Sequence, residues 1–314
     1  MMVDEKDRLI LFELLQNCRQ PLSKIAKEVR LPQQTVSYRI KKLETEKIIK
    51  KYTINVNYQK LGYNRHSLYL DLKHIDSKEV GDYIRHVTDI KEVSCCYMLH
   101  GLSQWKMYIS VWTKTIERYD EIQTKIISKF RKHIKNYISF QSVKSYTYLA
   151  RRLNPKKKGK ADVKDTSENV QLKEIDWKLI EKLKKDSIIP ILKLSKECKT
   201  TVNTAIKRIK FLEKNNIIQR FYPILDMNKL GYYEYTYISR IDPSFHKELE
   251  KFIEYAKSDP RFIIIIKAVG YVNLYYAFLA KDSNELSEIN AKVESILGKS
   301  VLETFKIEVE EMIS

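Results

Sequence analysis

The sequence predicts an α+β chain made of two copies of one module, each a three-helix unit followed by a small α/β domain. Three observations predict this architecture. The chain repeats itself at an offset of 169 residues, apolar residues spaced by three and four mark helices at the start of each copy, and alternating strand-like segments follow them. The 314 residues exceed one average domain and can build several small cores.

The repeat appears when the sequence is compared with itself at that single offset. The segment KLGY at 60–63 falls on KLGY at 229–232, and RIK at 39–41 falls on RIK at 208–210. Ungapped matches run from Asp7 and Asp176 to Gly101 and Gly270. Because a solenoid unit spans about 20 to 50 residues, a period this long indicates duplication of a whole module.

Each copy opens with three predicted helices. In the first copy an amphipathic helix covers 9–15 behind acidic residues that suit a helix N-terminus, and a second covers 22–29. Pro32 can open the third helix, in which Val36, Ile40 and Leu43 repeat at spacings of four and three. The second copy repeats the pattern within 180–212. We therefore expect a helix-turn-helix in each copy.

The outer face of each third helix carries amides, hydroxyls and basic groups. Amides pair with adenine edges and basic groups with guanine or phosphate, so such a helix suits the DNA major groove. A small helical bundle with a solvated charged face is the alternative. The predicted DNA-binding residues are Gln33, Gln34, Ser37, Tyr38, Arg39, Lys41 and Lys42 in the first copy, and Thr201, Asn203, Lys207, Arg208 and Lys210 in the second.

Two of these residues have a competing interpretation. Arg39 and Arg208 could contact DNA phosphates, or each could form an ion pair on its own helix with Glu44 or Glu213. In the first case the lysines at 156–160 would add sequence-independent attraction, and binding would weaken steeply with salt.

The rest of each copy reads as βαββαβ. The first copy has strand patterns at 67–72, 93–99, 105–111 and 138–148, with helices at 78–87 and 116–134. The second has strands at 235–241, 262–269, 274–280 and 301–309, and helices ending at Ala256 and spanning 285–297. This order predicts two ferredoxin-like α+β domains.

The copies are separated by a basic stretch with few large apolar residues, beginning RRLNPKKKGK at 151. We interpret it as a flexible linker. The predicted domains are a first helix-turn-helix at 1–55, a first α/β domain at 56–150, a basic linker at 151–172, a second helix-turn-helix at 173–224 and a second α/β domain at 225–314.

Asp7, Ile10, Leu14, and the stretches PLSKIAKEV at 21–29 and TVSYRIKKLETEKIIK at 35–50 resemble the Lrp/AsnC (feast/famine) transcription regulators. In that family a winged helix-turn-helix precedes a ferredoxin-like, RAM-type domain that binds effectors and self-associates. The resemblance implies two such pairs of domains in tandem, with double-stranded DNA as partner and self-association through the α/β domains. The two unlike helix faces then predict a covalent pseudo-dimer that prefers an asymmetric operator.

The same resemblance places a small-molecule effector at the turn between the second and third strands, where the family has a glycine followed three residues later by aspartate. This chain has an amide in place of the carboxylate in both copies, and an amide accepts a hydrogen bond without contributing charge. The identity of any effector therefore stays open. Its candidate residues are Gly101, Ser103, Gln104, Gly270 and Asn273.

Charge and motifs bound the function classes. The net charge of +18 is uneven, with 14 Lys/Arg against 3 Asp/Glu at 114–160, which suits a polyanionic partner or serves solubility alone. The sequence lacks H-E-x-x-H, C-x-x-C and a glycine-rich phosphate loop. We therefore expect no catalytic residue, metal or cofactor, no membrane partner, and a cytoplasmic, nucleoid-associated protein.

Two other functions stay open. An architectural protein that coats DNA would have the same charge and duplicated domains. Siroheme decarboxylases share this domain order, and Tyr97, His100 and Trp105 invite that comparison, although the ungapped equivalents at 266, 269 and 274 are Ile, Val and Leu.

Overall fold

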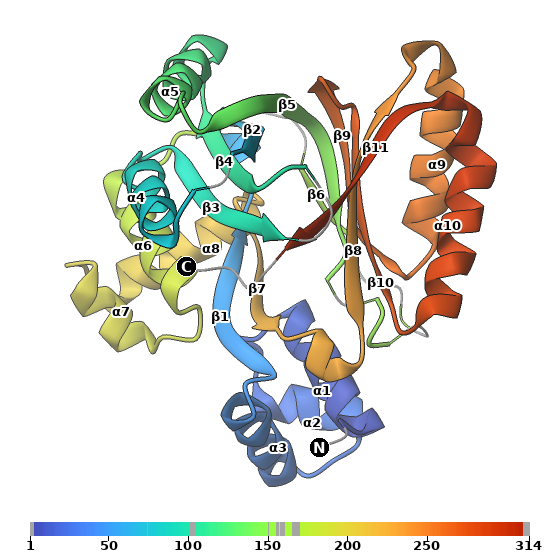
Figure 1. Ribbon diagram of the computed structural model, residues 1–314. Helices are drawn as coiled ribbons and strands as arrows, with labels where there is room; N and C mark the ends of the chain where they lie inside the picture. Colours follow the sequence, from blue (N-terminus) through green and yellow to red (C-terminus); the bar gives the residue numbers. More distant parts are fainter. Residues whose placement is uncertain are drawn as a thin grey trace.

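The computed structural model describes residues 3–73, 75–100, 104–149, 151–154, 157, 161–164 and 170–309. Figure 1 shows two helical units, one at the bottom and one at the left, joined by two long strands below a large sheet. The first unit comprises α1 (Glu5–Gln16), α2 (Leu22–Val29) and α3 (Gln33–Thr45), followed by β1 (Ile49–Val56) and the 3-10 helix η1 (Tyr58–Leu61). The second comprises α6 (Glu174–Lys185), α7 (Ile191–Glu197) and α8 (Val202–Lys214), followed by β7 (Ile218–Leu225) and η2 (Asn228–Leu230).

The backbone repeats at the same offset as the sequence. Arg30 and Lys199, 169 residues apart, have φ of 54° and 51°, and Lys47 and Asn216 both have φ of 55°. Positive φ is uncommon for residues other than glycine, so the same turns recur at the same places. This agreement confirms the duplication at the level of local conformation.

The two helical units are joined by the antiparallel pair β1–β7, in which Thr53 lies opposite Tyr222. These two residues are equivalent in the repeat, so a pseudo-two-fold axis passes between them. The hydrogen bond from Cys18 N to Phe221 O (2.9 Å) is matched by the one from Ser187 N to Tyr52 O (3.1 Å). The strand that follows each helix-turn-helix therefore pairs with the other copy, which differs from a self-contained winged unit.

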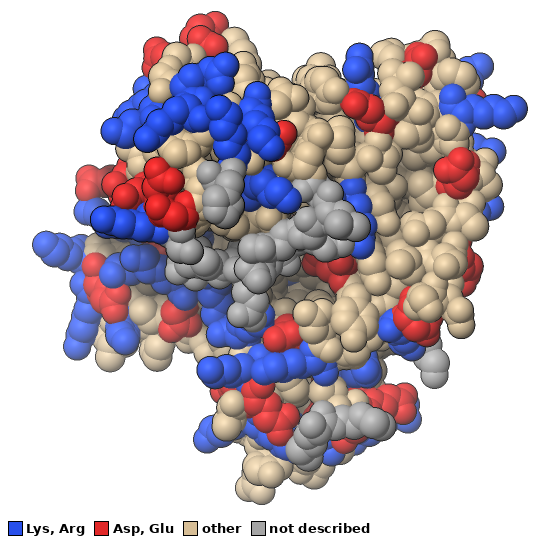
Figure 2. Space-filling model, viewed as in Figure 1, with Lys and Arg blue, Asp and Glu red and all other residues tan. Residues whose placement is uncertain are grey.

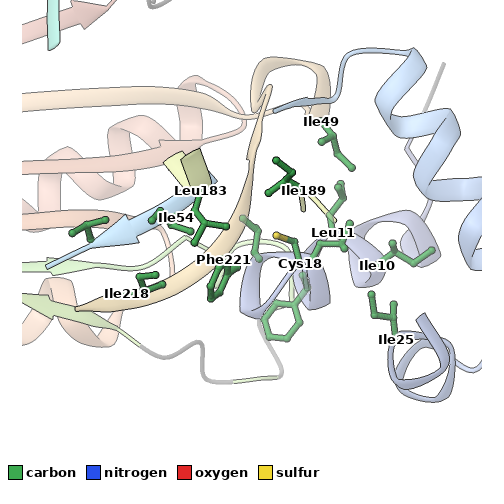
Figure 3. Close-up of a cluster of buried hydrophobic side chains, with 14 of the residues drawn as sticks. Ile10, Leu11, Cys18, Ile25, Ile49, Ile54, Leu183, Ile189, Ile218 and Phe221 are labelled. Atoms are coloured by element: carbon green, nitrogen blue, oxygen red, sulfur yellow. The ribbon is translucent and has the colours of Figure 1, made fainter. Parts of the chain in front are cut away.

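One hydrophobic core spans both helical units. Ile10 and Leu11 of α1 and Leu183 of α6 are fully buried in the same cluster as Ile54 and Phe221 of the two strands. Figure 3 shows these side chains converging from both copies. The units consequently share buried apolar surface, and neither has a complete core of its own.

Eight of the other described strands form a closed barrel. The first copy contributes β2 (Asn64–Leu72), β3 (Val93–His100), β4 (Met107–Thr113) and β5 (Ile134–Thr147), in the order β5-β2-β4-β3. The second contributes β8 (Tyr233–Ile241), β9 (Phe262–Gly270), β10 (Leu274–Ala280) and β11 (Val301–Val309), in the order β11-β8-β10-β9. Both orders are ferredoxin-like, as predicted, and the pairs β3–β11 and β5–β9 join the two sheets.

Helices cover the outside of the barrel. In the first copy α4 (Ser77–Thr88) and α5 (Ile116–Lys129) pack on one set of alternate strand residues, and in the second α9 (His246–Ser258) and α10 (Ser283–Leu297) do the same. The other set points inward and forms a separate core that includes Tyr69, Tyr108 and Phe140. Strand alternation thus fills two outer cores and one barrel interior.

The two β-hairpins differ in length. Tyr97 pairs with Tyr108 in the first copy, whereas the equivalent Ile266 pairs with Tyr275 in the second. The first hairpin is therefore two residues longer, and the offset falls to 167 after it. Trp105 corresponds to Val272, since both are buried inside the barrel, and the ungapped comparison of Trp105 with position 274 was wrong.

The described residues of the connecting segment are packed, contrary to the flexible linker that we expected. Arg151 donates to the carbonyl oxygens of Lys257 (2.5 Å) and Phe262 (2.7 Å) and stacks on Tyr148. Strand β6 (Asp162–Lys164) adds to β5, and Asp162 forms a buried ion pair with Arg220 of β7. These contacts hold Arg151 and Asp162 in place, because each of these charged groups has buried partners.

We predict that Gly270→Ala costs more than about 2 kcal/mol of unfolding free energy. An added Cβ would lie 2.7 Å from Ser139 O and 2.8 Å from Phe140 Cα, at a φ of +137°. Gly231→Ala is the matched control, since its φ is also positive (+77°) but its Cβ would meet open space. That control should cost about 1 kcal/mol. Urea unfolding measures both, and equal losses would contradict the close approach of β5.

Candidate nucleic-acid interface

Helix α3 of the first copy presents a polar outer face. The helix begins after Pro32, whose φ of −59° suits the first turn. Val36 and Leu43 are buried against the shared core. The opposite side exposes the predicted residues Gln33, Gln34, Tyr38 and Lys41, while Ser37, Arg39 and Lys42 are partly buried. Tyr38 is 66% exposed, so most of its aromatic ring faces solvent and is not packed against the core.

Helix α8 is built on the same scaffold. Ala205, Ile209 and Leu212 are its buried residues. The hydroxyl of Thr201 caps the helix by accepting a hydrogen bond from Thr204 N (3.1 Å). The predicted residues Asn203, Lys207 and Lys210 are exposed, whereas Arg208 is partly buried.

The two outer faces differ at equivalent positions. Tyr38 of α3 corresponds to the exposed Lys207 of α8, and Ser37 corresponds to Ile206, which is 37% exposed. Gln34 corresponds to Asn203, and lysine is shared at 41 and 210. The duplication therefore retains the buried side of the helix and changes the exposed side.

The two arginines form ion pairs, but with partners other than those expected. Arg39 Nη1 contacts Asp4 (2.7 Å) and Asp7 (2.8 Å), and Arg208 Nε contacts Asp176 (2.6 Å). These aspartates begin α1 and α6 rather than lying on the arginines' own helices. The hydrogen bonds that Arg39 donates to Asp7 and Asp4 raise the pKa of Arg39, and the hydrogen bonds that Arg208 donates to Asp176 raise the pKa of Arg208. Arg39 thus connects α3 to α1, and Arg208 connects α8 to α6.

Basic groups exceed acidic groups in both helical units. Residues 1–55 contain 12 Lys/Arg against 7 Asp/Glu, and residues 173–224 contain 13 against 6. Figure 2 shows blue side chains clustered at the left, over α5, α7 and α8. Lys157 of the connecting segment is paired with Glu13 and Glu28, and Lys156, Lys158 and Lys160 lie outside the described residues. Lys157 is therefore engaged by carboxylates of the chain, whereas Lys41, Lys207 and Lys210 are exposed on α3 and α8.

The proposed effector residues do not gather into one site among the described residues. Gly101 and Ser103 lie outside the described part of the chain, and Gln104 is exposed. The Asn273 amide both donates to Ile241 O (2.8 Å) and accepts from Ile241 N (2.8 Å). Gly270 lies against β5 at the joint of the two sheets. Gly270 and Asn273 of the second copy thus contribute to the structure of the barrel.

The residues that invited comparison with a decarboxylase are divided. Tyr97 packs on Tyr108 inside the barrel, with ring centroids 5.0 Å apart, and Trp105 is buried there against Phe305. The side chain of His100 lies outside the described part. Within the described ranges the structure contains neither a group of three side chains able to hold a metal nor a helix long and apolar enough to cross a membrane.

Sequence reasoning missed a polar group inside the barrel. Arg65 of β2 donates to Tyr108 Oη (2.6 Å), and its equivalent in the second copy is Glu234. The signal was present in the alternation of Arg65, Ser67 and Tyr69, which share one face of the strand. Polar residues at alternate positions of a strand in a closed barrel point to polar groups inside the barrel.

We predict that Arg208→Ala and Arg39→Ala differ in their effect on stability. The first leaves the carboxylate of Asp176, which is 0% exposed, without its cation and should cost about 3 kcal/mol. The second frees Asp4 and Asp7, which are 50% and 13% exposed and so keep some contact with water, and should cost less, about 1 kcal/mol. Thermal unfolding measures both, with Lys207→Ala as a neutral control. A larger loss of DNA affinity than of stability would instead assign these arginines to phosphate contacts.

Comparisons with known proteins agree with the helical geometry. Residues 3–44 match the family model of the AsnC-type helix-turn-helix domain. An uncharacterised helix-turn-helix transcriptional regulator of Pyrococcus furiosus is 32% identical over 134 residues, which cover 41% of this chain and 84% of that relative. The regulator LrpA of Pyrococcus horikoshii is 43% identical over 63 residues, 20% of this chain and 45% of LrpA.

A solved structure shares the two-copy fold. The siroheme decarboxylase NirDL superimposes with a TM-score of 0.62 over 99% of this chain and 95% of its own, at 13% identity. That identity shows a common fold alone. The first-copy sequence and the matched relatives give the family: the chain belongs to the Lrp/AsnC family of helix-turn-helix transcriptional regulators.

Proposed function

We propose that this chain is a sequence-specific regulator of transcription in which α3 and α8 each enter the major groove of double-stranded DNA and read unlike half-sites. The observation that carries the proposal is the contrast between the two sides of these helices. Their buried sides are equivalent and meet in one core, whereas their exposed sides differ at 34, 37 and 38 and their counterparts. In this account the protein acts in the cytoplasm, on the nucleoid.

The exposed groups suit different bases. On α3, the amides of Gln33 and Gln34 can pair with adenine edges and the Tyr38 hydroxyl can bond a base or phosphate. On α8, Asn203 suits adenine, Lys207 suits guanine and the exposed Ile206 suits a thymine methyl group. Two such readers favour an operator whose halves have different sequences.

The shared core makes the two readers one unit. A homodimeric regulator must bring two chains together, whereas here β1 and β7 pair within one chain. The second helix-turn-helix therefore meets DNA as an intramolecular partner, which raises its effective concentration. Pairing of α/β domains also occurs within the chain, and further association between chains stays a prediction.

Phosphate contacts are assigned to lysines in this proposal. Because Arg39 and Arg208 are held by aspartates, Lys41, Lys42, Lys207 and Lys210 remain on or beside the reading faces. Each phosphate that they neutralise releases a counterion, so affinity should fall steeply with salt concentration.

Exchanging the helix faces tests the proposal. A variant with Gln34→Asn, Ser37→Ile and Tyr38→Lys gives α3 the residues of α8 at these three positions. It should prefer a palindrome of the α8 half-site by at least about tenfold over the native operator. Selection from random DNA, followed by fluorescence anisotropy, measures the preference. The reciprocal variant, with Asn203→Gln, Ile206→Ser and Lys207→Tyr, should prefer the other palindrome.

A strictly palindromic optimum for the unchanged protein would contradict two unlike readers. Genome-wide mapping of bound DNA separates the remaining alternatives. Discrete sites upstream of promoters support a specific regulator, and blanket coverage supports an architectural protein. Absence of enrichment together with a copurified tetrapyrrole would favour an enzyme on this fold.

A further inference from the structure

A small cavity lies at the end of the barrel that adjoins η1, on the side of the joint between β5 and β9. Its volume is about 50 Å³. One wall is apolar and the others are polar, and the lining residues are Gln59, Arg65, Trp112, Ser142, Ser145, Thr147, Ile264 and Ile266.

A β-bulge shapes the polar wall. Ser142 pairs with Ala268 and Lys144 with Lys267, so Val143 is an extra residue in β5. Val143 is turned outward and 45% exposed. In a regular strand, residues 142 and 145 would point to opposite faces, but the bulge lets Ser142, Ser145 and Thr147 all line the cavity. Three hydroxyls thus lie in a row.

The cavity contains a cation without a counter-ion from the protein. Arg65 is partly buried, and its guanidinium donates a hydrogen bond to the hydroxyl of Tyr108 (2.6 Å). Within the described ranges no Asp or Glu pairs with this guanidinium. Removing a cation from water without a compensating charge is costly, so the site favours an anion.

A buried hydroxyl in the same wall also lacks a partner. Ser142 is 4% exposed, and its Oγ makes no hydrogen bond within the described part of the chain. Buried polar groups are nearly always hydrogen-bonded, and each exception calls for an explanation. A ligand oxygen in the cavity would satisfy this hydroxyl and the guanidinium together.

We propose that this cavity is a binding site for a small oxyanion, held by the Arg65 guanidinium and by the hydroxyl of Ser142. Since one water molecule needs about 10 to 15 Å³ of such a cavity, the cavity has room for roughly three or four non-hydrogen atoms. Carboxylate, bicarbonate and nitrate groups have that size, and Ile264 and Ile266 exclude water from one side. Guanidinium binds such planar groups with charge-assisted hydrogen bonds.

Among the described residues, the two copies have diverged at this site. The equivalent of Arg65 is Glu234, and the equivalents of Trp112 and Ile266 are Leu279 and Tyr97. The second copy therefore has the opposite charge at the corresponding place in the barrel. Neither the site nor its test depends on DNA binding.

Calorimetric titration of the full chain with formate, acetate, bicarbonate and phosphate, at constant ionic strength, tests the proposal. We expect saturable binding of the anions that fit. Arg65→Met should weaken it by about 10- to 100-fold, as for loss of a charge-assisted hydrogen bond. Ser142→Ala should weaken it by severalfold, and Glu234→Gln is the matched control with unchanged affinity.

The anions distinguish the two sources of the ligand. Preference for formate or acetate indicates the carboxyl end of an organic acid, and preference for bicarbonate or phosphate indicates a free inorganic anion. Ser142→Ala keeps the test valid if Arg65→Met fails to fold, since it removes a hydroxyl without a partner. The absence of saturable binding, equal affinities of the parent and Ser142→Ala, or a crystal structure with water alone in the cavity would overturn the proposal.

Discussion

The antiparallel pairing of β1 with β7 is the constraint on which the rest of the structure depends. It places two equivalent residues, Thr53 and Tyr222, opposite each other and so fixes the pseudo-two-fold axis. Around that axis α1 and α6 bury their apolar faces in a single core, and the two four-stranded sheets meet edge to edge as a barrel. Closure also removes the exposed strand edges that two separate sheets would present. The positions of α3 and α8 therefore follow from this one pairing.

Covalent fusion permits differences that a homodimer cannot have. In a homodimer each substitution appears twice and, near the axis, meets its own copy. Here Cys18 faces Ser187, and Arg65 corresponds to Glu234. The connecting segment adds a further asymmetry, because Asp162 pairs with Arg220 while the equivalent Lys51 is exposed. The exposed faces of α3 and α8 differ for the same reason, since the two copies of a fused chain can change independently.

Much of this arrangement could be predicted from sequence, and the failures share a physical reason. Apolar spacing predicted all three helices of each unit and the order of the strands, because periodicity reports which residues are buried. It does not report the partner against which they are buried. The pairing of β1 with β7 of the other copy was therefore missed. The ion pairs of Arg39 and Arg208 were missed as well, because their aspartates lie about 32 residues away along the chain.

Other failures concern length and local composition. The two-residue difference in length between the hairpins was missed. Few identical residues follow Gly270, so the ungapped comparison gave no sign that the offset changes there. The connecting segment read as a linker since it has few large apolar residues, but Arg151, Leu153 and Asp162 are each buried. The polar group of Arg65 inside the barrel could have been predicted from the alternation along β2, had closure of the barrel been known.

A designed disulfide across the pseudo-two-fold axis tests whether the two copies pair within one polypeptide. Cys18 Sγ lies 3.4 Å from Ser187 Oγ, so Ser187→Cys places two thiols within reach of each other. The other cysteines are replaced by alanine, and an oxidant is added because burial raises the pKa of the Cys18 thiol. We expect a disulfide within one chain, seen as faster migration of the monomer on a non-reducing gel. A disulfide between chains, or none, would contradict pairing of the two copies within one polypeptide.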